Sequence, residues 1–564
     1  MSGRATSFEI QVLQEKRWVL TEVVEDEATA IQFADGLLNK SSYEAVRVVR
    51  DFKRIDGLHS ETVVHEKAAA GQKVDMSLAP VAEAPVCTEL ADLYGLSSRL
   101  VIGRLFRRYL DEMVITPTEL LHNARELKRL ADKDRLLMSA VDSIATLQAP
   151  GGGDEAKARR DFLHSSWDQM VARARRAAPE KPPKQRKLVD LASMAAKAGT
   201  DADFQCLVLM AAQLLEQRAW LAKLDMVMNW AAEDCASPHM AAIDGLVADI
   251  LIPAQAIQDL LGFQANLGTA LCHICDLAEG KAEPAKFACE SFAVVNQLFT
   301  AGRLPQAREA LLNRVARELR GTNPLSRNQP DQEYEAFVRV LNRVVDYQGI
   351  VGGPAMADAM AQRYVRFHNM GGIPGMVNAV DEISGILGDG CRIALYLTAL
   401  VELPRAAASF GPALLGKLAE LARSRQHIDF WVPSRLPPRE RMAALTECHR
   451  AIRGALALPE GLKADLASRA DAVLASYLED DQVIEKIDRP EDPLAFRALR
   501  LVKFCSSGVL IAGKSLDMAQ QRVLSHLRQP QFEEKFLASI PDPGQAERHL
   551  REFHRLLMES GFKP

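Results

Sequence analysis

Residues Gly349–Gly375 read GIVGGPAMADAMAQRYVRFHNMGGIPG and set one helix-length segment between two breaks. The breaks, at Gly352–Pro354 and Gly371–Gly375, are rich in glycine and proline. Glycine tolerates the backbone conformations of turns, and proline starts or ends helices rather than continuing them. Because helix-length apolar patterns separated by short breaks continue from Leu188 to the C-terminus, the sequence predicts a chain built mainly of helices.

The segment between the breaks combines cations, aromatic rings and a histidine. Residues three or four apart share one face of a helix, so the two arginines are neighbours and the tyrosine lies beside the histidine. Each break also leaves free backbone N–H groups at the start of the following helix, and such groups bind anions. We therefore expect a small anion or a nucleotide to bind here, at Arg363, Tyr364, Arg366, His368, Gly371 and Gly372.

A structural interpretation of the same segment stays open, and we favour it over the ligand site. Tyr364 and Phe367 fit the buried face of a helix. The two arginines fit ion pairs with nearby carboxylates, for which the candidates are Asp358, Asp381 and Glu382. In this interpretation the glycines only permit sharp turns and close helix packing.

Composition bounds the class of protein. Of 564 residues, 48% are hydrophobic and 25% are charged, as in ordinary soluble globular proteins. This length predicts about three or four domains, because a single hydrophobic core does not grow to that size. Aromatic residues make up only 6%, which favours closely packed helices over sheet sandwiches. The net charge of −5 argues against a dedicated nucleic-acid-binding protein, whose binding domain is basic.

The cysteines and the N-terminal residues indicate in which cellular compartment the protein is expected. The nine cysteines are scattered and odd in number, which favours free thiols in a reducing environment. The N-terminal residues MSGRATSFEIQ lack the apolar core of a secretory signal, and no apolar run of about 18 residues is long enough to span a membrane. We therefore expect a cytoplasmic protein, and the preference for arginine over lysine suggests a bacterial source.

The first 67 residues differ in pattern from the rest. Phe8, Ile10 and Val12 alternate with polar residues, as in a half-buried strand. Asp26 is expected to cap a helix, and three further β-rich runs cover 18–24, 46–49 and 62–65. The order predicts a ββαββ module. One helix covers one face of such a sheet, so the other face is left for a partner or for the rest of the chain.

The remainder is predicted to be a large all-α body. Thr116-Pro117-Thr118-Glu119 is its clearest helix start, with threonine at the N-cap and glutamate at N3. No repeat of fixed period is present, so we expect stacked helical hairpins, arranged as an irregular α-solenoid or as helical bundles. The predicted parts are an α+β module (1–67), a linker (68–87), a helical segment (88–148), a charged helix with a basic proline-rich linker (149–187), a helical domain (188–430) and a C-terminal helical domain (431–564).

Metal and catalytic chemistry has weak support. The weak metal-ligand candidates are Cys272, His273, Cys275 and Cys289, but adjacent side chains of a helix diverge by about 100° and zinc needs four converging ligands. Glu-x-x-His, the spacing of di-iron helices, occurs at Glu119–His122 without a convincing second copy. We expect neither a phosphate-binding Gly-Lys-Ser/Thr loop nor a G-x-S-x-G elbow. We therefore assign no catalytic residue, no metal and no cofactor.

These observations favour a non-enzymatic scaffold or regulatory protein that binds another protein through helical surfaces and the N-terminal sheet. The alternative is a ligand-gated sensor that binds a small anion or nucleotide at residues 349–375. An enzyme with an all-α active site is the third hypothesis. A protein partner is expected and a small anionic ligand is compatible, whereas nucleic acid and membrane are not expected partners.

Overall fold

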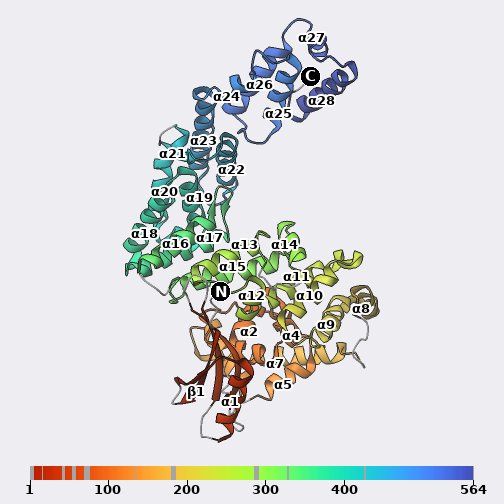
Figure 1. Ribbon diagram of the computed structural model, residues 1–564, viewed down its shortest axis with the longest axis vertical. Coiled ribbons are helices and arrows are strands. Elements are labelled where there is room, and N and C mark those ends of the chain that lie inside the picture. The colour runs from red at the N-terminus through yellow and green to blue at the C-terminus, as the bar shows by residue number, and fades with distance from the viewer. Residues whose placement is uncertain are drawn as a thin grey trace. The chain divides into compact units, whose positions relative to one another are not determined.

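The computed structural model is mainly helical, with a small antiparallel sheet near the N-terminus (Figure 1). It describes residues 6–14, 17–40, 45–53, 59–68, 77–133, 135–179, 186–284, 291–326, 330–424 and 427–562. The chain divides into two compact units. The sheet unit comprises Met1–Ala79 and Asp132–Ala140, and the helical unit comprises Pro80–Ala131 and Val141–Pro564. The prediction of a mainly α chain with a small N-terminal sheet is confirmed.

The strands of the sheet unit follow the order β2–β1–β3–β4, and each neighbouring pair is antiparallel. The Asp26 carboxylate accepts a hydrogen bond from the Thr29 backbone N–H at 2.8 Å, so the predicted cap of the helix is confirmed. The elements are β1 (Thr6–Gln14), β2 (Arg17–Val24), α1 (Glu27–Lys40), β3 (Ala45–Lys53) and β4 (His59–Ala68).

Helix α1 packs on one face of this sheet. The core between them consists of alternate residues of β1 and β3 with two alanines of α1, namely Phe8, Ile10, Val12, Val46, Val48, Ala30 and Ala34. Successive side chains of a strand point to opposite faces, so the intervening residues belong to the face away from α1. We call this the outer face, and it carries Glu9, Gln11, Trp18, Val23, Arg47, Val49, Val63 and Glu66.

The helical unit is a succession of helices joined by short connections, and α6 continues into it from the sheet unit. Its elements are η1 (Leu90–Tyr94), α2 (Leu96–Leu105), α3 (Arg107–Met113), α4 (Pro117–Leu121), α5 (Ala124–Ala131), α6 (Leu136–Gln148), α7 (Gly153–Ala177), α8 (Leu188–Ala195), η2 (Ala196–Asp201), α9 (Ala202–Leu214), α10 (Trp220–Ala231), η3 (Asp234–His239), α11 (Met240–Ile250), α12 (Ala254–Leu261), α13 (Leu267–Ala278), α14 (Phe292–Thr300), α15 (Pro305–Arg320), α16 (Pro330–Val344), β5 (Val345–Asp346), β6 (Gly349–Ile350), α17 (Gly353–Phe367), α18 (Gly372–Leu387), α19 (Gly390–Val401), α20 (Pro404–Ala422), α21 (Ile428–Trp431), α22 (Pro438–Gly454), α23 (Glu460–Asp480), α24 (Val483–Ile487), α25 (Leu494–Ser506), α26 (Lys514–Leu527), α27 (Phe532–Ala538) and α28 (Pro543–Glu559).

A continuous hydrophobic core runs through this unit from Leu188 to Leu556. Near its N-terminal end, α4 contacts α2, α9 and α11, and α15 packs on both α2 and α11. These contacts bring together five helices that are far apart in sequence. They enclose the candidate site described below.

No single helix of the described residues is both long and apolar enough to cross a membrane. One pair, Asp234–Ile250 with Ala254–Leu261, meets the length and composition criteria only when its halves are joined, and they are bent by 95°. Apolar residues of both halves, among them Ile243, Leu246 and Leu260, are buried in the core.

Candidate functional site

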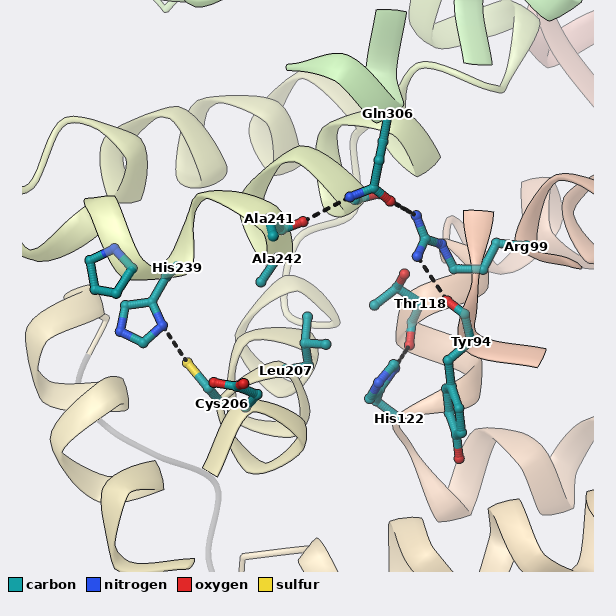
Figure 2. Close-up of a pocket in the computed structure, with 13 residues that line it drawn as sticks. Tyr94, Arg99, Thr118, His122, Cys206, Leu207, His239, Ala241, Ala242 and Gln306 are labelled. Atoms are coloured by element: carbon teal, nitrogen blue, oxygen red, sulfur yellow. Dashed lines mark hydrogen bonds between the residues drawn. The ribbon is translucent and has the colours of Figure 1, made fainter. Parts of the chain in front are cut away.

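Helices α2, α4, α9, α11 and α15, together with η1 and η3, line a pocket of about 270 Å³ that is open to solvent on one side, called the cavity below (Figure 2). Figure 2 shows His239 and Cys206 on one side of the cavity and Arg99 with His122 on the other. Leu207 and small residues of α11 line the space between these polar groups. The cavity therefore combines polar ends with an apolar middle.

Arg99 forms the largest hydrogen-bond network at this cavity. Its Nε donates to Asp249 Oδ1 at 3.0 Å, and its Nη1 donates to the Tyr94 carbonyl oxygen at 3.0 Å. Its Nη2 donates to Gln306 Oε1 at 3.2 Å and to the Gly245 carbonyl oxygen at 3.4 Å. A Cβ at Gly245 would lie 3.1 Å from Nη2, so glycine allows this close approach. All three guanidinium nitrogens are therefore engaged by the protein.

Asp249 links Arg99 to the first turn of α4. Its Oδ2 accepts hydrogen bonds from the Thr118 backbone N–H at 2.8 Å and from the Thr118 hydroxyl at 2.6 Å. The Asp249 side chain is fully buried, and each of its oxygens has a charged or polar donor. A buried carboxylate needs such partners, because desolvation is otherwise costly. This network fixes α4 relative to α2 and α11.

The predicted capping box at Thr116 is confirmed, and it leads into a buried ion pair. Thr116 Oγ1 accepts from the Glu119 N–H at 3.1 Å, and Glu119 Oε2 accepts from the Thr116 N–H at 2.8 Å. Glu119 Oε1 pairs with Lys223 of α10, and both side chains are fully buried. Burial raises the pKa of Glu119 and lowers that of Lys223, while their mutual attraction opposes both shifts.

His122 follows α4 and presents a neutral ring to the cavity. Its Nδ1 lies 2.8 Å from the Thr118 carbonyl oxygen, so Nδ1 carries the proton and Nε2 carries the lone pair. Burial lowers the pKa of His122 to about 4. The ring packs against Tyr94 and Phe204, with centroid separations of 5.2 and 4.8 Å. At neutral pH His122 is therefore a hydrogen-bond acceptor held in a fixed orientation.

The opposite side of the cavity carries a thiol, an imidazole and a carboxylate. Cys206 Sγ lies 4.0 Å from His239 Nδ1, and Asp203 precedes Cys206 by one turn of α9. Burial raises the pKa of Cys206 to about 11, so the group is a thiol at neutral pH. The thiolate is the reactive form of cysteine. The arrangement therefore suits ligand binding better than nucleophilic catalysis.

The arginines of the 349–375 segment are engaged at the C-terminal end of α15. Arg363 donates to the carbonyl oxygens of Gly321 and Asn323 at 3.1 and 2.9 Å and pairs with Glu333. Arg366 donates to the carbonyl oxygen of Gly321 and to that of the preceding residue. The last carbonyls of a helix lack partners within the helix, and these two side chains supply them.

The structure also places the remaining residues expected at that site. Tyr364 is buried, packs on Phe337 and stacks on His368 with a centroid separation of 4.4 Å. His368 is exposed, as are Gly371 and Gly372 at the start of α18. The spacing thus brings Tyr364 and His368 together as expected. Anion binding at these residues stays a prediction.

The weak metal candidates lie on or near α13. Cys272 and Cys275 are buried in the core, and burial raises their pKa values to about 11 and 12. His273 is partly buried on the same helix, and Cys289 lies outside the described residues. Within the described ranges, no group of three His, Cys, Asp or Glu side chains is placed to hold a metal ion.

The expectation that the chain contains no phosphate-binding loop spacing is wrong at residues Gly508–Ser515. They read GVLIAGKS, which matches the G-x-x-x-x-G-K-S spacing of phosphate-binding loops. Such loops follow a strand, whereas α25 precedes this one and Val509–Ile511 are buried. The N–H groups of Lys514 and Ser515 donate to the Asp471 carboxylate at 2.6 and 3.0 Å. An internal carboxylate thus caps the helix where a phosphate would bind.

Sequence reasoning found only the part of the cavity that is local in the chain. The Thr116–Glu119 cap was recognisable from four consecutive residues. Arg99 and Asp249 are 150 residues apart, and Cys206 and His239 are 33 apart, so no spacing rule connects them. Comparison with protein-family models, with curated proteins and with solved structures gives no match to this chain. The geometry therefore carries the functional argument alone.

Proposed function

We propose that this protein is a non-enzymatic scaffold or regulatory protein that binds another protein through the outer face of its sheet. The observation that carries the proposal is the exposure of two valines there. Val23 is 48% exposed and Val63 is 45% exposed, on strands at the two edges of the sheet. Apolar groups that stay exposed beside ordered polar groups are typical of interaction surfaces.

Across the sheet, Glu9 and the buried Val49 lie between these valines, and an ordered group of side chains continues from Glu9 along the outer face. The Arg47 guanidinium carbon lies 4.4 Å from the Trp18 ring centroid, and Arg47 Nε donates to Gln11 Oε1 at 2.8 Å. Gln11 Nε2 donates in turn to Glu9 Oε2 at 2.9 Å. Tryptophan and arginine are enriched among residues that dominate binding energy, and ordering them beforehand lowers the entropy lost on association.

The chemistry of the outer face favours a polypeptide over nucleic acid. Arg47 is its central cation, and it is accompanied by Glu9 and the exposed Glu66. A phosphate backbone needs an excess of positive charge, and the whole chain has a net charge of −5. An apolar segment of a partner protein, placed over Trp18 and the valines, fits the apolar groups of this surface.

The way in which successive helices of the helical unit pack together also supports a scaffold function. Successive helices pack side by side in the pairs α19–α20, α22–α23 and α25–α26, and α23 packs on both α20 and α26. We infer that such pairs stack as helical hairpins in an irregular solenoid. A surface of this kind grows with each pair and offers extended sites to partners.

A matched pair of substitutions tests the outer face. Val19 is 44% exposed, nearly as much as Val63, but it pairs with Val12 on the α1 side of the sheet. Tagged full-length protein is used to capture partners from a lysate of its source cells. We expect a specific partner to bind wild-type protein and the Val19→Asp variant, and to be lost from the Val63→Asp variant.

Direct binding of the captured partner, purified and titrated against each variant, completes the test. We expect the Val63→Asp substitution to weaken this binding about tenfold or more, because it places a charge in the apolar contact. Circular dichroism of each variant checks that the fold is kept. Equal loss of the partner in both variants, or equal retention in both, contradicts the proposed surface.

A further inference from the structure

Several polar groups at the cavity beside Arg99 are already satisfied by the protein. Arg99 donates from all three nitrogens. Gln306 accepts from Arg99 and donates to the Ala241 carbonyl oxygen at 3.1 Å, and the Thr118 hydroxyl donates to Asp249. The positive charge at the wall is thus paired, and each guanidinium nitrogen donates at least one hydrogen bond to the protein.

Two acceptors at the cavity remain unused. Asp203 forms neither a hydrogen bond nor an ion pair with any other described residue. His122 is 4% exposed, and its Nε2 has no hydrogen-bond partner in the described part of the chain, because Nδ1 makes the bond to Thr118. Asp203 lies one turn before Cys206 on α9, and Figure 2 shows Cys206 on the side of the cavity opposite His122.

The charges around the cavity favour a cation. Arg99 pairs with Asp249, and the nearby Arg173 pairs with Asp201 at 2.6 Å, so these four groups cancel. The Asp203 carboxylate is left without a cation of its own. Asp203 is exposed and lines the cavity, so its carboxylate attracts a positively charged ligand to this end and repels an anion.

Size and wall chemistry limit the rest of the ligand. A volume of about 270 Å³ lies just below the roughly 300–1,000 Å³ of ordinary ligand pockets. Leu207 and Ala242 provide apolar contacts between the two ends of the cavity, and Pro238 is a further apolar residue of its lining. These features suit a short aliphatic chain that carries donors at both ends.

We propose that the cavity binds a small aliphatic ammonium compound with a second hydrogen-bond donor, such as an amino alcohol or a diamine. The ammonium group binds the Asp203 carboxylate, the second donor binds His122 Nε2, and the chain between them packs on Leu207. Binding here is independent of the outer face of the sheet, so the two proposals fail or succeed separately.

Calorimetric titration of the full-length protein with four matched compounds tests this site. Aminobutanol carries both features, butylamine lacks the second donor, butanediol lacks the charge, and hydroxybutyrate reverses it. We expect saturable binding of aminobutanol, binding of butylamine that is several-fold weaker, and no saturable binding of the other two. Binding of hydroxybutyrate as tight as that of aminobutanol, or no binding of any amine, overturns the proposal.

Variants then locate the binding. Asp203→Asn is expected to weaken aminobutanol binding about tenfold or more, because a charge-assisted hydrogen bond is lost. Asp517 is also an exposed aspartate in the first turn of a helix, α26, so Asp517→Asn is the matched control and should leave the affinity unchanged. Ala242→Phe, which fills the cavity without changing charge, is expected to abolish binding. Wild-type affinity in both cavity variants, with folding verified by circular dichroism, overturns the assignment.

Discussion

The segment Gly349–Gly375 and the cavity beside Arg99 contain similar residue types, but the structure uses them differently. In the segment, both arginines donate to the end of α15. At the cavity Arg99 is equally engaged, yet Asp203 and one nitrogen of His122 keep unused hydrogen-bonding capacity. A candidate ligand site is therefore marked by unused acceptors facing a cavity, and not by the presence of cations alone.

The comparison has energetic consequences. Engaged buried groups stabilise the fold, because removing one partner leaves the other desolvated and unpaired. Unused groups contribute little to folding and gain their partner only from a ligand. Substitutions in the segment and in the framework of the cavity should therefore change stability, whereas a change at Asp203 should mainly change binding.

The largest effect is expected at the ion pair that supports α4. Lys223→Ala leaves the fully buried Glu119 without its partner, and we expect a loss of about 3–5 kcal/mol of unfolding free energy. Urea unfolding followed by circular dichroism measures it. The double variant Lys223→Met with Glu119→Gln removes both charges, keeps a side-chain acceptor for the Thr116 N–H, and should recover most of the loss. If the double variant is as unstable as Lys223→Ala, then the unpaired charge of Glu119 is not the cause of the lost stability.

A smaller effect is expected within the segment, and it differs between the two arginines. Arg363 is 5% exposed and pairs with Glu333, so Arg363→Ala should lower the unfolding free energy by about 3 kcal/mol. Arg366 is exposed, so Arg366→Ala should lower it by less than about 1 kcal/mol. The same urea titrations compare the two variants. Equal losses would mean that burial does not decide the role of these arginines.

Local patterns carried the predictions that succeeded. Alternation along β1 gave the first strand of the sheet, Asp26 marked the start of α1, and the Thr116 capping box marked the start of α4. Each of these depends on residues fewer than ten positions apart, where backbone geometry fixes which side chains meet. The predicted division into six parts and the predicted anion site stay predictions.

Ion pairs between residues far apart in the chain could not be predicted from local patterns. Spacing along the chain suggested a partner for Arg363 on its own helix or on the next one. Its partner is instead Glu333 on α16. Asp358, one of the expected partners, pairs instead with Arg320 at 3.3 Å. The GVLIAGKS motif shows the reverse case. Its residues have the spacing of a phosphate-binding loop, but they lie between helices α25 and α26. The N–H group at the start of α26 donates to the carboxylate of the distant Asp471.

An effect smaller than that of Arg363→Ala is a pH dependence that arises from His122. The folded-state pKa of about 4 lies below the ordinary value of 6.5, so between these values the unfolded chain binds a proton that the folded chain does not. Stability contributed by the neutral ring is therefore full above pH 7 and is lost as the pH falls toward 4. Between pH 7 and pH 5 we expect the loss from this residue to be about 2 kcal/mol.

His122→Phe isolates this contribution, because phenylalanine keeps an aromatic ring between Tyr94 and Phe204 but does not titrate. Urea unfolding at pH 7 and at pH 5 should show a fall in stability that is about 2 kcal/mol smaller for His122→Phe than for wild-type protein. An unchanged pH dependence in His122→Phe would mean that His122 is accessible to protons in the folded protein. Water would then reach the His122 end of the cavity, and the acceptors there would be hydrogen-bonded to solvent before any ligand binds.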